Sequence, residues 1–493
     1  MSKIKKLAFG VGWGAFSTIA VTGFQLVFMA VMARLLEPAD FGLVAVANVS
    51  LRFFSFFAQM GTGPALIQKP KLEEGDIAAA LTVSLGISGL FFVLALIAAP
   101  FFEVFFQMPE LSLVIRALSI NFIIGGFSTV SVGLLQRNTA FRALAIIEVI
   151  SYIVGYGIVG LGAAYHELGV WSLVAAFMTQ TTLTALFSYA VNRHSLRLRH
   201  TAAQRRHFLN YGGRYSVIGF TEFLSASLDA LVVGKLLGAA TAGFYSRASL
   251  LANLPVQQPA NILTKALFPI MSSVGNQHDK QIMSLQLSTL LVGSYAFAVS
   301  AGIYIAAPDI VKVLLGNKWL DTIPILEMLS WSVGPAYISH VAGVTLDSLN
   351  KLTIKLYIQL SMLVLIIVLL LFAVPTGNVI YIAAAVVAME WVRLGSMTIK
   401  LTRILRMPFR EVVLITLCIA IIAISTSLMI WSVSELIGSN FTSMIKLGAE
   451  ILAGATGLLL GFLITRYVAV RLPAVRFLAD RAPIFAKFFP KFA

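Results

Sequence analysis

The chain has 493 residues, of which 59% are hydrophobic and only 12% charged, and its mean hydropathy is +0.91. Soluble domains contain roughly 45–50% apolar and about 25% charged residues, so this composition excludes a soluble globular protein and predicts an integral membrane protein. The net charge of +15 does not indicate a nucleic-acid partner, because the basic residues lie in short segments between apolar stretches. The single cysteine, Cys418, excludes an intramolecular disulfide.

Taken in chain order, the apolar stretches predict fourteen membrane-spanning helices, at about 20 residues per span. The first follows MSKIKK and is about twice as long as a signal-peptide core, so we interpret it as an uncleaved span. A cytoplasmic N-terminus places 26 of the 36 basic residues on the cytoplasmic side, which predicts that both termini are cytoplasmic. The predicted spans are 7–35, 41–67, 77–101, 111–136, 140–163, 169–191, 211–237, 243–272, 282–306, 322–348, 352–374, 378–400, 412–431 and 444–466.

A repeat divides these spans into two related halves. The stretch ARLLEPADFGL from Ala33 returns 201 positions later as GKLLGAATAGF from Gly234, so that Gly42 corresponds to Gly243. Internal repeats of this kind are typical of transporters. We therefore predict an N-terminal six-helix lobe (1–192), a basic cytoplasmic linker (193–210), a second six-helix lobe (211–400), two additional helices (401–467) and a basic tail (468–493) that lies on the membrane surface or is solvated.

Charged residues inside predicted spans are the candidates for function, since a charge facing lipid costs at least about 2.5–3.5 kcal/mol. Arg52, Arg247 and Lys265 have no acidic residue within four positions, so each needs a partner on another helix or an anionic ligand. Guanidinium groups bind phosphate oxygens in a bidentate way, which favours a diphosphate. The structural alternative is pairing with Glu148, Glu222 or Asp229, or extension of Arg247 to the membrane surface.

Other charged residues in spans are Glu327, Asp347, Glu390, Arg393 and Glu450. Glu390 and Arg393 are three residues apart on a predicted helix, and this spacing predicts a local ion pair. Glu222 and Asp229 are seven residues apart and share a helix face.

The eighth predicted span is the least regular. It contains Pro255 and Pro259, which remove backbone donors and predict a kink whose carbonyls need other partners. The same span carries amide side chains suited to a sugar: Asn253, Gln257, Gln258 and Asn261. A purely structural kink is the alternative.

No motif predicts covalent chemistry. The phosphate loop G-x-x-x-x-G-K-[ST] is missing from the sequence, and the six histidines are scattered without metal-ligand spacing. We expect neither an enzyme nor a bound metal or cofactor.

Four segments resemble one transporter family. They are ARLLEPADFGL, GPALIQ, LQRNTAFRALAIIE and GFYSRASLLANLPVQQPANILTKALFPIMS. These segments resemble the polysaccharide transporter branch of the multidrug/oligosaccharidyl-lipid/polysaccharide exporter superfamily, most closely the Wzx-type O-antigen and colanic-acid exporters. The resemblance covers nearly the whole chain.

The resemblance implies an all-α inner-membrane protein, similar in fold to drug antiporters and lipid II flippases of that superfamily, that moves undecaprenyl-diphosphate-linked oligosaccharides by alternating access. It implies a cationic cavity for the substrate head, to which Arg52 and Arg247 fit by position, and ion coupling for which Glu148, Glu222 and Asp229 are candidates. Expected partners are the lipid-linked substrate, membrane lipids and a polysaccharide polymerase. The alternatives are a cation-coupled drug antiporter, a membrane scaffold and a membrane glycosyltransferase; the antiporter should have an acidic cavity, and the transferase should have a larger loop than any in this chain.

Overall fold

The computed structural model describes residues 3–58, 62–69, 71–196, 200–273, 278–438 and 441–475. Every regular element in these ranges is helical, which confirms the predicted all-α class. The chain divides into two compact units, Met1–Ser246 and Arg247–Ala493, and α9 contributes to both. The predicted lobe boundaries at 192 and 210 stay predictions.

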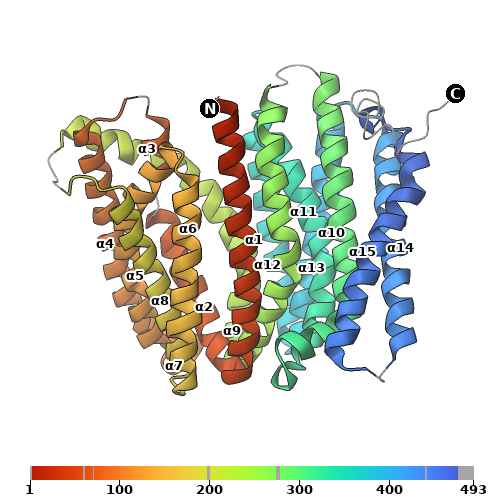
Figure 1. Ribbon diagram of the computed structural model, residues 1–493, viewed down its shortest axis with the longest axis horizontal. Helices are drawn as coiled ribbons and strands as arrows, with labels where there is room; N and C mark the ends of the chain where they lie inside the picture. The colour runs from red at the N-terminus through yellow and green to blue at the C-terminus, as the bar shows by residue number, and fades with distance from the viewer. Residues whose placement is uncertain are drawn as a thin grey trace. The chain divides into compact units, whose positions relative to one another are not determined.

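The first unit contains eight α-helices and the beginning of a ninth. In Figure 1, α4, α5, α6 and α8 run alongside one another. The helices are α1 (Lys3–Leu35), α2 (Pro38–Ala58), α3 (Thr62–Gln68), α4 (Glu74–Phe106), α5 (Leu111–Arg137), α6 (Phe141–Tyr152), a π-helical segment (Ile153–Gly160), α7 (Leu161–Tyr165), α8 (Val170–Val191) and the first part of α9 (Ala202–Ser273).

The second unit begins within α9. In its described part, α14 and α15 pack on each other and on α10, and α11 packs on α10 and α13. The elements are α10 (His278–Leu314), a 3-10 turn (Asn317–Trp319), α11 (Thr322–Ser348), α12 (Leu352–Ala373), a second 3-10 turn (Val374–Thr376), α13 (Val379–Ile404), α14 (Phe409–Ile437) and α15 (Ser443–Ala469).

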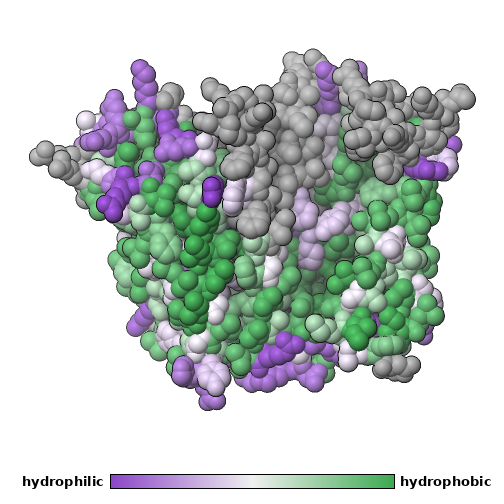
Figure 2. Space-filling view, viewed as in Figure 1, coloured by the Kyte–Doolittle hydropathy of each residue, from purple (hydrophilic) through white to green (hydrophobic). Residues whose placement is uncertain are grey.

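Many of these helices can cross a membrane. Among the described residues, ten helices are long and apolar enough to do so, which makes this a multi-pass membrane protein; the count of fourteen stays a prediction. In Figure 2, the surface over α4 and α5 is hydrophobic along the middle of the helices and hydrophilic at their ends. Such a band matches a hydrocarbon layer between two aqueous phases.

The two predicted spans 211–237 and 243–272 belong to one helical element, α9. Its backbone leaves helical geometry only at Gly238, where φ is 82° and ψ is 178°. A positive φ of this size is unfavourable for residues with a Cβ, so glycine permits the turn here. At Pro255 and Pro259, where the sequence predicts a kink, the helix continues without a break.

A neighbouring side chain compensates for the proline at 259. Pro259 has no N–H, so the carbonyl of Pro255, four residues earlier, has no helical donor. The hydroxyl of Tyr295 on α10 donates to this oxygen at 3.0 Å. The carbonyl is therefore satisfied by protein, which fits the structural interpretation of this proline.

We expect Tyr295→Phe to lower the free energy of unfolding by about 1–3 kcal/mol, because it leaves the half-buried carbonyl of Pro255 without a donor. The measurement is thermal unfolding of the purified protein in detergent. Tyr304→Phe is the matched control, since Tyr304 is exposed and contacts Trp331 through its ring. Equal melting temperatures for both variants would contradict this role of the hydroxyl.

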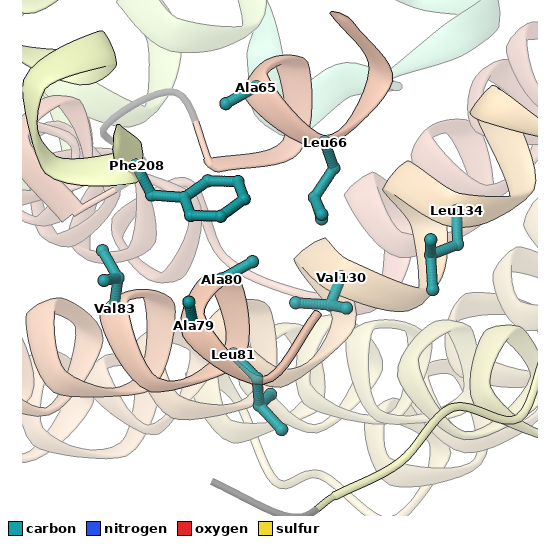
Figure 3. Close-up of a cluster of buried hydrophobic side chains, with 9 residues drawn as sticks. All are labelled: Ala65, Leu66, Ala79, Ala80, Leu81, Val83, Val130, Leu134 and Phe208. Carbon is teal, nitrogen blue, oxygen red and sulfur yellow. The ribbon is translucent and has the colours of Figure 1, made fainter. Parts of the chain in front are cut away.

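A hydrophobic cluster lies at the end of the first unit where α3 ends and α4 begins. Phe208, in the second turn of α9, is fully buried among Ala65 and Leu66 of α3, Ala79 and Ala80 of α4 and further apolar residues (Figure 3). The predicted linker is thus helical from Ala202 onward. The buried ring of Phe208 packs the start of α9 against the rest of the first unit.

An arginine holds the short helix α3 in place. The guanidinium of Arg137, at the end of α5, donates to the carbonyls of Leu66 at 2.7 Å and Lys69 at 2.5 Å. A cation at a helix C-terminus also interacts favourably with the helix dipole. Lys69 in turn forms an ion pair with Asp76, which is buried in the first turn of α4. The segments GPALIQ and LQRNTAFR therefore contact each other and support the architecture.

Candidate substrate site

Arg52 lies on α2, fourteen residues after Pro38, with its side chain exposed. Its guanidinium makes no hydrogen bond or ion pair with another described residue. The alternative of an ion pair with Glu148 or Asp229 is therefore not observed. A cation at this depth in an apolar helix, with no carboxylate partner among the described residues, can bind an anion from outside the chain.

Glu148 lies on α6 and is likewise exposed and without a partner among the described residues. Arg52 and Glu148 thus carry opposite charges on different helices of the first unit without pairing. The side chain of Glu222, the third predicted carboxylate, lies outside the described residues.

Asp229 is held by a tyrosine rather than by a cation. The hydroxyl of Tyr245, which is buried, donates to one carboxylate oxygen of Asp229. The other oxygen is buried and has no hydrogen-bond partner among the described residues. A buried carboxylate without a counter-charge is costly, so this arrangement suits a group that takes up a proton or a cation. The sequence reasoning missed Tyr245, because the two residues are sixteen positions apart and meet only through the turn at Gly238.

In the second unit, Arg247 is half-buried and engaged in an interaction, so it is not a free cation. Asn253, also half-buried, donates from its side chain to the carbonyl of Ser249 at 2.9 Å, one turn back on its own helix. Gln257 is exposed. The side chains of Gln258, Asn261 and Lys265 lie outside the described residues.

The remaining charges in predicted spans include paired and buried groups. The predicted local pair is confirmed, since Arg393 and Glu390 are 2.9 Å apart. Asp347 pairs with Lys355 at 2.9 Å across the turn between α11 and α12. The sequence reasoning missed a third pair, in which Lys446 of α15 lies 3.2 Å from Asp309 of α10. Glu450, one turn after Lys446, is almost fully buried.

The second unit also contains a cavity of about 400 Å³ between α10, α11, α13 and α14. Its walls are mainly apolar and include Trp391 and Ile415. Gln286 supplies a polar end and donates to the carboxylate of Glu411 at 2.5 Å. Of the predicted substrate residues whose side chains the structure describes, none lines this cavity.

Among the described residues, no group of three or more His, Cys, Asp or Glu side chains could hold a metal ion. The site candidates are therefore single charges within helices and the Asp229–Tyr245 pair. These groups can bind ions and polar head groups.

Comparisons with known proteins agree with this architecture. A family model described as "Polysaccharide biosynthesis protein" matches residues 31–324, more than half of the chain. The lipopolysaccharide biosynthesis protein WzxC of Escherichia coli (strain K12) is 23% identical over 330 residues, covering 67% of each chain. The succinoglycan biosynthesis transport protein ExoT of Rhizobium meliloti (strain 1021) is 26% identical over 349 residues, covering 69% of this chain and 70% of its own.

Among solved structures, the lipid II flippase MurJ in an inward closed conformation superposes with a TM-score of 0.72 at 13% sequence identity. The match covers 94% of this chain and 100% of MurJ, and at this identity it shows a shared fold. The match of the family model, which begins just before the first hairpin and continues through the whole of α10 into the first turn of α11, is the evidence for membership. The chain belongs to the polysaccharide biosynthesis protein family.

Proposed function

We propose that this protein is a flippase that moves undecaprenyl-diphosphate-linked oligosaccharide repeat units across the bacterial inner membrane, for exopolysaccharide or lipopolysaccharide synthesis. Family membership, the transport function in the name of ExoT and the shared fold with a lipid II flippase support this proposal. The observation that carries it is Arg52, a guanidinium within an apolar helix that has no partner among the described side chains. A diphosphate offers the paired oxygens that guanidinium groups bind best.

In this proposal, Arg52 contacts the diphosphate, with Arg247 and Lys265 adding positive charge. Asn253, Gln257, Gln258 and Asn261 contact sugar hydroxyls. Glu148, Glu222 and Asp229 are the candidates for ion coupling, and Asp229 is favoured because one of its carboxylate oxygens is buried with no partner among the described residues. The protein performs no covalent chemistry, both termini face the cytoplasm, and a polysaccharide polymerase consumes the delivered repeat unit.

The experiment is complementation of a bacterial strain that lacks its own repeat-unit exporter. Expression of the protein together with its native glycosyltransferases should restore surface polysaccharide and remove the accumulated lipid-linked repeat unit from the inner leaflet. Continued accumulation in the presence of correctly inserted protein would refute the proposal. Drug efflux without any change in polysaccharide would instead support the antiporter alternative.

A further inference from the structure

The two copies of the repeated hairpin touch each other through their glycines. A Cβ added to Gly42 would lie 1.8 Å from the carbonyl oxygen of Ala239. A Cβ added to Gly243 would lie 1.9 Å from the carbonyl oxygen of Pro38. Since 38 + 201 = 239 and 42 + 201 = 243, the two contacts are equivalent under the sequence repeat. The start of α2 and the segment of α9 after Gly238 therefore meet backbone to backbone.

Only glycine permits so close an approach at both positions. A Cβ closer than 3.0 Å to a carbonyl oxygen requires the backbone itself to move, because no flexible side chain can yield. Both glycines are buried, and both have ordinary helical conformations, so backbone flexibility is not the reason for glycine here. The reason is the contact.

The packing of α2 against α9 continues toward the C-terminal end of α2, beyond Gly42. Val46, one turn further on, is buried, and its Cγ2 lies 2.6 Å from the place of a Cβ on Gly234. The Nζ of Lys235 donates a hydrogen bond to the carbonyl of Phe105 at the end of α4. The same nitrogen lies 4.9 Å from the centre of the Phe105 ring. Figure 1 shows the start of α2 beside α9 at this end of the first unit.

On the predicted topology, with both termini in the cytoplasm, the contact lies between Arg52 and the outer face of the membrane. Arg52 is ten residues beyond Gly42 on the same helix, which is about 15 Å at 1.5 Å per residue. The charge distribution places the hairpins on the side opposite the cytoplasm. A closed contact here separates the proposed head-group site from the outer leaflet.

We propose that the reciprocal Gly42–Gly243 contact is the outer gate of the protein, closed in this structure and separated when the substrate is released. The proposal rests on the proposed transport function for its role, but the contact itself can be tested without substrate. Glycine at both positions lets the gate close without a gap between backbones.

The test uses a cysteine reporter behind the gate. Cys418, the one native cysteine, is replaced by alanine, and Val46→Cys is labelled in intact cells with a membrane-impermeant maleimide. Gly42→Ala and Gly243→Ala should each raise the labelling rate at least about tenfold, because a methyl group forced into the contact disfavours the closed state. Gly89→Ala on α4 is the control, since a Cβ there meets nothing within 4 Å, and it should leave labelling unchanged.

Unchanged labelling in both hairpin variants would overturn the gate, as would an equal rise in Gly89→Ala. If neither hairpin variant accumulates in the membrane, the reporter in the unsubstituted protein decides: labelling should rise when the cells synthesise substrate, and no labelling in either condition would overturn the gate. Export that fails even in the unsubstituted protein, while the hairpin variants still raise labelling, would refute the proposed transport function and leave the gate standing.

Discussion

Arg52→Ala should reduce export of the lipid-linked repeat unit roughly 10- to 100-fold. A charge-assisted hydrogen bond to phosphate contributes about 1.5–3 kcal/mol, and Arg52 has no carboxylate partner among the described residues that would account for its presence otherwise. Its side chain is exposed, so truncation leaves no cavity and should not affect folding. The measurement is the rate at which the labelled repeat unit reaches the outer leaflet in complemented cells, normalised to the amount of protein in the membrane.

Two further variants serve as controls for Arg52→Ala. Arg52→Lys keeps the charge but loses the bidentate geometry, so it should retain an intermediate rate. Arg116→Ala removes an exposed arginine from α5 near its start, away from the proposed site, and should export at the wild-type rate. Wild-type export by Arg52→Ala would remove this residue from the mechanism, and equal loss in Arg116→Ala would indicate a general effect of positive charge.

The sequence predicted those features that depend on local pattern. Apolar runs of sufficient length predicted the membrane helices, since each helix satisfies its own backbone without distant partners. The spacing of Glu390 and Arg393 predicted their ion pair for the same reason, because residues three apart on a helix are neighbours. The repeat from Ala33 and Gly234 predicted two equivalent hairpins, and both occur in the structure as a short break between helical segments.

Contacts between distant segments could not be predicted from the sequence. Tyr295 and Pro255 are forty residues apart, and only the packing of α10 against α9 brings the hydroxyl to the free carbonyl. The pairing of Lys446 with Asp309 spans even more of the chain. In each case the residue type was visible, but its partner depends on helix packing that no local pattern encodes.

The contact between the two repeated hairpins is a further feature that the sequence did not predict. The matching of Gly42 with Gly243 was evident in the sequence, where it indicated only equivalent positions. Their mutual contact is a property of the packed state, because equivalence in sequence does not by itself bring two segments together. The charged residues differ, since Arg52 corresponds to Asn253 under the repeat. Asn253 donates a hydrogen bond to its own helix, whereas Arg52 has no partner in the described part of the chain. The repeat therefore accounts for the framework, and the position at which the two copies differ is the candidate site.

The beginning of the predicted tail also depends on packing. Leu472 and Val475 are buried in a cluster with Ile415 and Ile419 of α14. Residues 468–475 therefore pack on the second unit, and the rest of the predicted tail lies outside the described residues. The alternation of basic and apolar residues did not distinguish burial against protein from burial in the membrane surface, since both present the same apolar face to a non-aqueous medium.

Asp229→Asn should abolish the response of export to an ion gradient and slow export at least about tenfold, the effect of losing a single charged interaction worth ~1.5 kcal/mol. Asparagine has nearly the same shape and still accepts the hydroxyl of Tyr245, so the fold should be retained. It can neither take up a proton at neutral pH nor offer full negative charge to a cation. The measurement is export into everted membrane vesicles under an imposed proton or sodium gradient.

Tyr245→Phe is the control for the Asp229 prediction, because it removes the hydrogen bond and keeps the carboxylate. This variant should still respond to whichever gradient accelerates the wild-type protein, with an altered rate. A gradient response in Asp229→Asn equal to that of the wild type would assign coupling elsewhere. Glu148 on α6 would then be the next carboxylate to test, since it is exposed and has no partner among the residues that the structure describes. Loss of the response in both variants would show that coupling requires the hydrogen bond from Tyr245 as well as the charge of Asp229.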